Sequence, residues 1–190
     1  WRITAKGKKL QEPPKIHGAS VSELVKLLER PEYRYRYWAK REIRELAPAA
    51  VEKALDSWVA GLKPDDPRLA HHQLEAVWTY RSIDKSRPAL LRKLLGSGNQ
   101  KARAAATHQL RYWHEELPDA IKILNQLAND ENSIVRMEAV IAASYIGSKA
   151  ALDAVMDVFQ HPIGGHLAYA AGCALGSSTL ARHTAGNKAY

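Results

Sequence analysis

Residues 117–147 read LPDAIKILNQLANDENSIVRMEAVIAASYIG and contain two helix patterns separated by a polar turn. In the first pattern, apolar residues recur every three positions from Ile121 to Leu127. The turn NDENS, residues 129–133, breaks this helix, and Gly147 closes the second one. The stretch therefore predicts a helical hairpin, and the buried stripe of its second helix is expected to contain Val135, Ala139, Val140, Ala143 and Ile146.

The same layout returns four more times along the chain. With Arg136 and Ala139 as reference anchors, the equivalent pairs are Arg36 with Ala39, Gln73 with Ala76, Arg103 with Ala106, and Ala168 with Ala171. A first-helix pattern precedes each pair, at residues 21–30, 48–62, 88–95, 118–128 and 149–159. Neither helix of such a pair can bury its apolar stripe alone, and a small second anchor lets neighbouring helices approach closely. We therefore expect an all-α solenoid of stacked hairpins, in preference to an irregular helical bundle.

Two resemblances sharpen this expectation. Asp130 followed by Val135 and Arg136 resembles the Asp and Val-Arg signature of HEAT repeats, in which the two side chains form a polar ladder between adjacent hairpins. The equivalent of Asp130 is Ser97 before Arg103 and Arg30 before Arg36, so the resemblance does not imply a continuous ladder. The expected fold is an α-solenoid of about five HEAT-like helical hairpins with an extended N-terminal arm.

Five longer strings resemble one particular HEAT segment. They are RITAKGKKL, PEYRYRYWAKREI, HHQLEAVWTY, RAAATHQLRYWHEELPDAI and VRMEAVIAASY, and they are similar to the HEAT segment of large bacterial multidomain proteins described as membrane-bound dehydrogenases with a haem-binding domain. In that family a β-propeller precedes the HEAT segment, and a cytochrome c domain with a CxxCH motif often follows. The resemblance implies an extracytoplasmic connector, periplasmic or membrane-associated, inside a larger redox protein. This sequence has no CxxCH motif, so we expect no haem and no other cofactor in this segment.

The predicted organisation has three parts. Residues 1–19 form an extended arm or linker leaving an upstream domain, or else a disordered basic arm; residues 20–176 form the repeat domain; residues 177–190 form a flexible tail. The sequence contains no run of about 18 or more uncharged apolar residues, so we expect no membrane-inserted helix. The single cysteine, Cys173, is expected to be a small core residue.

The formal net charge of +8 is concentrated near the start of the chain. Residues 1–47 hold 12 Lys and Arg against 6 Glu, whereas residues 48–190 hold 16 against 14 acidic residues. A DNA-binding HEAT-like protein of the alkylpurine DNA glycosylase kind is the alternative function, but it would need cations along its inner helices. The distribution disfavours specific nucleic-acid binding, and a free-standing cytosolic adaptor is a third possibility.

No arrangement of residues predicts catalysis or metal binding. His71 and His72 are adjacent and point to different sides of a helix, which is poor geometry for one metal ion. His71 and Glu75 are expected to form a surface pair on a helix. Acidic neighbours such as Glu115 and Glu116 fall in predicted turns. We expect this segment to have no enzymatic activity of its own, although a parent protein could be a dehydrogenase.

An aromatic and basic stretch, residues 33–44, is the strongest candidate for partner binding because Tyr, Trp and Arg dominate protein–protein hot spots. Helical spacing predicts that Tyr35, Trp38, Ala39 and Ile43 are buried. The partner-binding candidates are Arg34, Tyr37, Lys40, Arg41 and Arg44, together with His71, His72, Arg111 and Trp113 of the central repeats. The expected partners are neighbouring domains of the same polypeptide or another protein.

Overall fold

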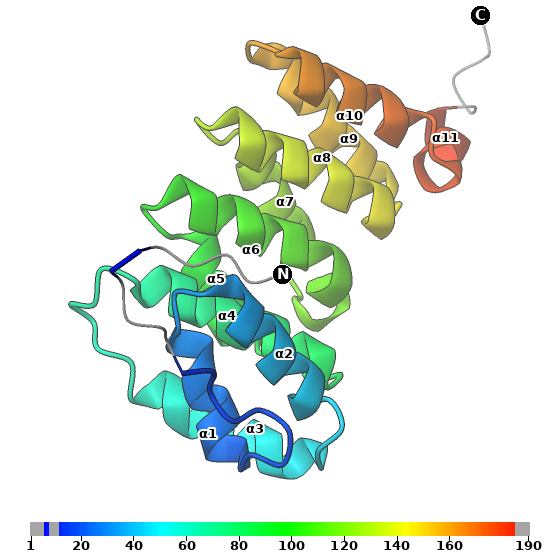
Figure 1. Cartoon of the computed structure of the whole chain (residues 1–190). Coiled ribbons are helices and arrows are strands. Elements are labelled where there is room, and N and C mark those ends of the chain that lie inside the picture. The colour runs from blue at the N-terminus through cyan, green and yellow to red at the C-terminus, as the bar shows by residue number, and fades with distance from the viewer. Residues whose placement is uncertain (1–5, 8–11, 185–190) are drawn as a thin grey trace, which may run out of the picture. The chain divides into compact units, whose positions relative to one another are not determined.

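The computed structural model describes residues 6–7 and 12–184, and this part of the chain contains eleven α-helices, three short 3-10 turns and no strand (Figure 1). The predicted all-α class is therefore confirmed. The chain divides into two compact units, Trp1–Leu62 and Lys63–Tyr190, which are described separately.

The first unit contains helices α1 (Val21–Lys26), continued by a 3-10 turn over Leu27–Glu29, α2 (Tyr33–Ile43) and α3 (Pro48–Ala60). α1 begins with a reciprocal cap, because the Ser20 hydroxyl accepts from the Glu23 backbone N–H while the Glu23 carboxylate accepts from the Ser20 N–H. α1 packs against both α2 and α3. Leu24, Leu28 and Ile43 are fully buried in this unit.

The second unit contains α4 (Leu69–Ser82), α5 (Pro88–Leu95), α6 (Gln100–Trp113), α7 (Ala120–Ala128), α8 (Ser133–Ile146), α9 (Lys149–Asp157), α10 (Gly165–Leu175) and α11 (Ser178–Thr184), with 3-10 turns over His114–Glu116 and Val158–Gln160. α5 pairs with α6, α7 with α8 and α9 with α10, as the repeat predicts. The second helices α6, α8 and α10 lie side by side in that order (Figure 1). The stacked hairpins predicted from the repeat are thus confirmed here, and α1 with α2 forms a further pair in the first unit.

The alanine anchors explain how the helices approach. Ala39, Ala76, Ala106, Ala139 and Ala171 are all buried, with at most 1% of their surface exposed. A longer side chain at these positions would hold neighbouring helices apart. The prediction of a small residue at the second anchor is confirmed at every copy.

The arginine anchors have a shared role that the sequence did not indicate. Nη1 of Arg36, Arg103 and Arg136 donates in each case to the carbonyl oxygen six residues earlier, at distances of 2.7, 2.8 and 2.7 Å. Those carbonyls belong to the loops between the two helices of each hairpin, where no helical N–H can satisfy them. Each anchor arginine therefore closes the loop of its own hairpin.

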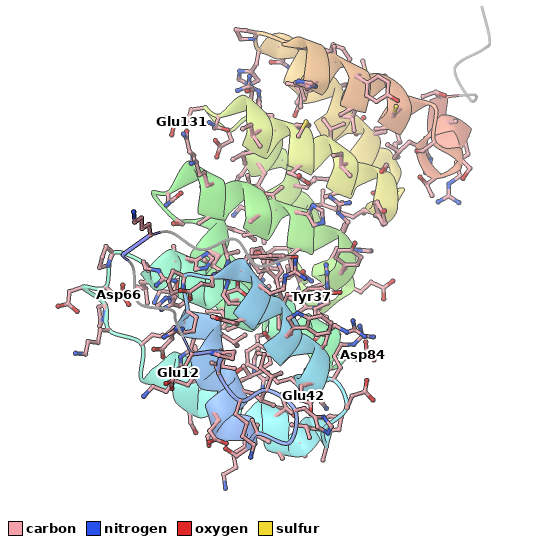
Figure 2. All side chains as sticks on the ribbon, viewed as in Figure 1. Glu12, Tyr37, Glu42, Asp66, Asp84 and Glu131 are labelled. Atoms are coloured by element: carbon pink, nitrogen blue, oxygen red, sulfur yellow. The ribbon has the colours of Figure 1, made fainter. Side chains whose placement is uncertain are left out.

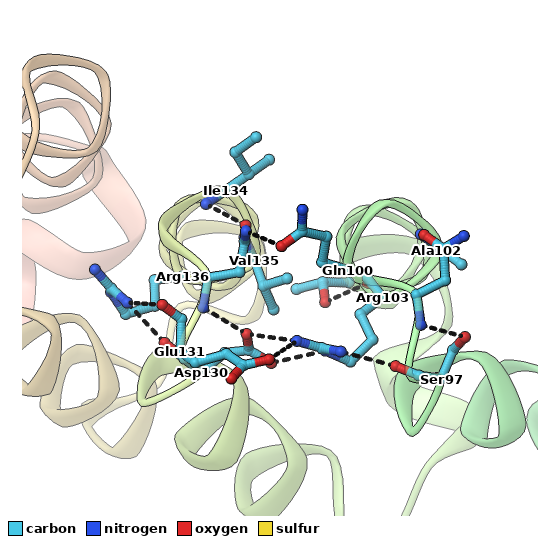
Figure 3. A network of polar contacts seen from close by, with 12 residues as sticks. Ser97, Gln100, Ala102, Arg103, Asp130, Glu131, Ile134, Val135 and Arg136 are labelled. Atoms are coloured by element: carbon cyan, nitrogen blue, oxygen red, sulfur yellow. Dashed lines mark hydrogen bonds and ion pairs between the residues drawn. The ribbon is translucent and has the colours of Figure 1, made fainter.

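One rung of a polar ladder joins two hairpins (Figure 3). The Asp130 carboxylate accepts from Nε and Nη2 of Arg103 at 2.9 and 3.0 Å, and Gln100 accepts from Asn132 at 2.6 Å beside it. This bidentate pair links α6 to the loop before α8, which is the between-hairpin geometry that the HEAT resemblance implies. In two of the other copies Ser97 and Arg30 occupy the position of Asp130, so neither of those copies can supply a carboxylate there.

The end of the described chain differs from the expected flexible tail. Ser178–Thr184 form α11, in which Leu180 is fully buried. Thr179 donates to the Ser144 carbonyl at 2.6 Å, and Arg182 donates to the Gly147 carbonyl at 2.9 Å. Small and polar residues form a helix here because these long-range contacts stabilise it; residues 185–190 lie outside the described residues.

The N-terminal arm is partly outside the described residues as well, including the WRIT string. Residues 12–19 form no helix or strand. Its last turn is held to α2, because the Gly18 N–H donates to the Glu42 carboxylate at 3.2 Å and Ala19 is buried.

Candidate functional site

The candidate site lies on the exposed face of α2. Arg36, Ala39 and Ile43 form the buried side of this helix, at spacings of three and four residues. Trp38 was expected among them, but it is 39% exposed, and Tyr35 is only half-buried. The expectation was wrong because Trp38 is rotated by about one-third of a turn from Ala39, and the long Arg36 side chain takes the buried position instead.

The exposed aromatic rings of α2 stack on one another. The Tyr33 and Tyr37 ring centroids are 6.1 Å apart with an interplanar angle of 29°, and Tyr37 meets Trp38 edge to face at 5.5 Å. The Arg41 guanidinium lies over the Trp38 ring, 4.9 Å from its centroid. The rings and the guanidinium are therefore arranged in advance, although all of them are accessible to solvent.

Arginines flank these rings. Arg34, Arg41 and Arg44 are exposed, and within the described residues none of them forms an ion pair with a carboxylate. The Glu42 carboxylate (labelled with Tyr37 in Figure 2) is turned to the N-terminal arm, where it lies 3.2 Å from His17 Nδ1 and accepts from Gly18. We name Tyr33, Arg34, Tyr37, Trp38, Arg41 and Arg44 the α2 surface. Lys40, the remaining candidate on this helix, is half-buried.

A hollow of about 490 Å³ borders the α2 surface. It is lined by Ile16, His17, Trp38, Arg41, Glu42 and Glu45. An apolar ring, a cation and a carboxylate therefore face the same space, which suits a polypeptide segment with mixed apolar and polar side chains.

Two of the other predicted partner-binding residues are buried. His72 and Trp113 each expose only 5% of their surface, so neither forms part of an exposed surface. For Trp113 the reason is that α6 packs against α5 and also against α8, which covers two sides of the helix. The predicted pair of His71 with Glu75 is present, with 3.6 Å between His71 Nε2 and the Glu75 carboxylate, but only His71 is partly exposed, because Glu75 is buried.

Arg111 is held inside a polar cluster. Its Nη2 donates to the Glu138 carboxylate at 2.8 Å and to His108 Nδ1 at 2.7 Å. Burial, followed by the neighbouring Arg111 guanidinium, lowers the pKa of His108. We therefore assign a neutral His108 whose Nδ1 accepts from Arg111, with Glu138 paired to Arg111 rather than to the imidazole.

The sequence analysis missed a second aromatic and basic row beside this cluster. Arg81 of α4 lies over the Tyr112 ring at 4.4 Å, and Arg111 lies over the Tyr145 ring at 5.2 Å. Tyr112 and Tyr145 are 6.3 Å apart and both are exposed. They are separated by 33 residues, the same spacing as Arg103 and Arg136, so the repeat register contained the signal.

Cys173 is exposed rather than a core residue. It lines an apolar groove of about 650 Å³ between α8 and α10. The core expectation was wrong because α10 has a neighbouring second helix on only one side within the described stack.

Neither a metal cluster nor a membrane-spanning helix is found in the described residues. No group of three or more His, Cys, Asp and Glu side chains among residues 6–7 and 12–184 could hold a metal ion. No helix in the same part of the chain is both long and apolar enough to cross a bilayer.

The comparisons with known proteins agree with the stacked hairpins. No match is found among the curated proteins. Residues 87–176, which span α5 to α10, match the family model of HEAT repeats. This part of the chain is therefore similar to HEAT repeats, in agreement with its stacked helical hairpins.

Proposed function

We propose that this chain is a noncatalytic HEAT-repeat scaffold that holds a neighbouring protein domain through the α2 surface. The observation that carries the proposal is the set of stacked, exposed rings beside three arginines that have no ion pair within the described residues. Stacked side chains lose little rotamer freedom on binding, so more of the contact energy remains available for affinity.

The partner is expected to combine apolar and acidic side chains. Tyr33, Tyr37 and Trp38 offer rings that gain free energy when a partner removes them from water. The guanidinium groups of Arg34, Arg41 and Arg44 can each bind a carboxylate through two parallel hydrogen bonds. Residues of these types are the ones that most often dominate a protein–protein interface.

Duplex DNA is a poorer match for this chain. The two arginines of the central repeat on which DNA binding would depend are already occupied, Arg103 by Asp130 and Arg111 by Glu138. Residues 48–190 carry almost balanced charge, 16 Lys and Arg against 14 acidic residues, which disfavours affinity for a phosphate backbone.

The larger context that we propose is an extracytoplasmic redox protein in which this segment connects other domains. The support is the resemblance to the HEAT segment of dehydrogenase and haem-binding multidomain proteins, since the string PEYRYRYWAKREI contains every residue of the α2 surface except Arg44. In such a protein a cytochrome c domain would bind the haem, while this segment would hold the domains in position.

Sequencing of the gene on both sides tests the connector. The expected result is a propeller-encoding region before residue 1 or a CxxCH-containing domain after residue 190. A reading frame that encodes only this helical segment would refute the proposal that it connects other domains. The scaffold function would then be tested by the binding experiment alone.

Binding of the adjacent domain, expressed as a separate chain, tests the α2 surface. Tyr37→Ala and Arg41→Ala are each expected to weaken binding about 10-fold or more, as hot-spot residues do. Tyr112→Ala is the matched control, because Tyr112 is a similarly exposed tyrosine in the other unit. Equal losses in all three variants, or tight binding of single-stranded DNA in place of the domain, would contradict the proposal.

A further inference from the structure

The second unit carries a repeated pair of an arginine and a tyrosine. Arg81 of α4 lies over the Tyr112 ring of α6, and Arg111 of α6 lies over the Tyr145 ring of α8. In the repeat register the two arginines occupy equivalent positions, and so do the two tyrosines. Each pair therefore joins one second helix to the next, and we name these four side chains the arginine–tyrosine row.

The stacking of the hairpins does not require tyrosines at these places. The equivalent positions of the hairpins on either side are Ser82 and Ser177. Tyr112 and Tyr145 are nevertheless 48% and 53% exposed, although both lie in the middle of the stack with a second helix on each side. Exposed tyrosines beside arginine are typical of a surface that binds another polypeptide.

The two arginines differ in what holds them. The Glu138 carboxylate accepts from Arg111 Nη2 at 2.8 Å. Arg81 donates through Nη1 to the Gln109 side-chain oxygen at 3.3 Å, and it forms no ion pair with a carboxylate of the described residues. A guanidinium has five N–H donors along its edge, and stacking on a ring leaves this edge accessible. Arg81 is therefore a positioned cation that has donors left for a ligand.

The charge of the row favours an acidic ligand. Glu138 neutralises Arg111, and His108 between them is neutral, because burial and then the Arg111 guanidinium lower its pKa. The cluster of Arg81, His108, Arg111 and Glu138 thus has one positive charge more than negative charges. A carboxylate could pair with Arg81 through two parallel hydrogen bonds.

The separation of the rings suits an extended polypeptide. Each residue of an extended chain advances about 3.2–3.4 Å, so alternate side chains on one face are about 6.4–6.8 Å apart. The centroids of Tyr112 and Tyr145 are 6.3 Å apart. Two apolar side chains at alternate positions can therefore each contact one ring. A nucleic-acid strand fits less well, because one unpaired cation adds little affinity for a phosphate backbone.

We propose that the arginine–tyrosine row binds an extended acidic polypeptide segment. Its carboxylate pairs with Arg81, and its next two alternate side chains, which are apolar, lie against Tyr112 and Tyr145. Because this contact covers few side chains, a dissociation constant on the order of 100 µM is expected for a short peptide. The inference does not depend on the α2 surface, which belongs to the other unit.

Fluorescence anisotropy of a labelled nonapeptide with the full chain tests the row. The peptide has one Glu and then two Leu at alternate positions, separated by Ser and flanked by Gly. Its affinity should fall as the salt concentration rises. Arg81→Gln should weaken binding about 10-fold, because it removes a charge-assisted pair, and Tyr112→Ala should weaken it about 5-fold. Tyr37→Ala, in the α2 surface, should leave it unchanged. The two surfaces thus serve as controls for each other.

Photo-crosslinking to the unmodified chain is a second measurement, which does not depend on how a variant folds. With benzophenone in place of one Leu, the label should appear in residues 112–122 or 137–149, the tryptic peptides that contain the two tyrosines. Label confined to residues 33–44 would overturn the proposal. So would absence of binding, an Arg81→Gln variant that binds normally, or an equal loss in Tyr37→Ala. Equal or tighter binding of the peptide with Lys in place of Glu, or of a labelled thymidine oligonucleotide, would overturn it as well.

Discussion

Removal of the Asp130 carboxylate should destabilise the second unit more than the loss of any exposed ion pair. The Arg103 and Asp130 side chains are only 11% and 12% exposed, and two hydrogen bonds of 2.9 and 3.0 Å join them. The same carboxylate accepts from the Asn132 N–H at 2.8 Å, which shapes the turn before α8. Asp130→Ala therefore leaves one guanidinium and one backbone donor without their acceptor.

The magnitude follows from what remains around Arg103. Loss of one partner of a fully buried ion pair costs about 3–5 kcal/mol. Arg103 keeps its bond to the Ser97 carbonyl at 2.8 Å and a contact with Glu131 at 3.2 Å, but the Glu131 side chain is 86% exposed (Glu131 is labelled in Figure 2). We therefore expect a loss of about 2–3 kcal/mol in the free energy of unfolding.

Urea unfolding followed by helical circular dichroism measures this loss. Asp119→Ala is the matched control, since Asp119 also forms a bidentate pair with an arginine, Arg92, but both side chains are about 40% exposed. That variant should stay close to the unmodified chain. A double-mutant cycle with Arg103→Met should give a coupling above about 1 kcal/mol. Equal effects of Asp130→Ala and Asp119→Ala would refute the assignment of the rung as a stabilising contact.

Three further changes probe the core, a helix end and a histidine. Leu110→Ala, at a fully buried position of α6, should lower the free energy of unfolding in urea by about 3 kcal/mol. Ile146→Ala, at a half-buried position, should lower it by about half as much. Equal losses would show that Leu110 is not more deeply buried in the core than Ile146. Gly147→Ala should lower the thermal midpoint and Gly96→Ala should not, because Gly147 has φ of 64° and its added Cβ would lie 2.9 Å from Thr179. Folding lowers the pKa of His108 from 6.5, so the unfolded chain binds more protons than the folded chain. The free energy of unfolding should therefore fall as the pH drops below about 6.5. The His108→Gln variant should lose less stability over this range, and a pH profile identical to that of the unmodified chain would exclude a neutral His108.

The spacing of small residues predicted the fold well because it reflects a steric requirement. Ala106, Ala139 and Ala171 recur at almost constant intervals, and each is buried where two helices approach. Such a requirement is local to one position and therefore visible in the sequence. The role of Arg136 was less visible, because its acceptors are backbone carbonyls of the loop, which no residue type identifies.

The side of a helix that remains exposed was harder to predict. A single apolar stripe identifies one buried side, but α6 packs against both α5 and α8, so Trp113 is buried although it looked like a surface residue. The opposite error occurred at Cys173, where an apolar helix suggested a core position that no following helix covers within the described residues. Both errors arise because burial in a repeat protein depends on how many neighbours a helix has, and this number depends on its place in the stack.

The exposed sides of α2 and α10 differ in polarity. The α2 surface is polar and aromatic, so it remains soluble while exposed and can exchange partners. The α10 side is uncharged and apolar, and leaving it in water costs free energy in proportion to its area. A partner of α2 should therefore be selected by its charge, and its binding should weaken as the salt concentration rises. Measuring the affinity of the adjacent domain for this chain at two salt concentrations tests this dependence, and an affinity that salt leaves unchanged would contradict it.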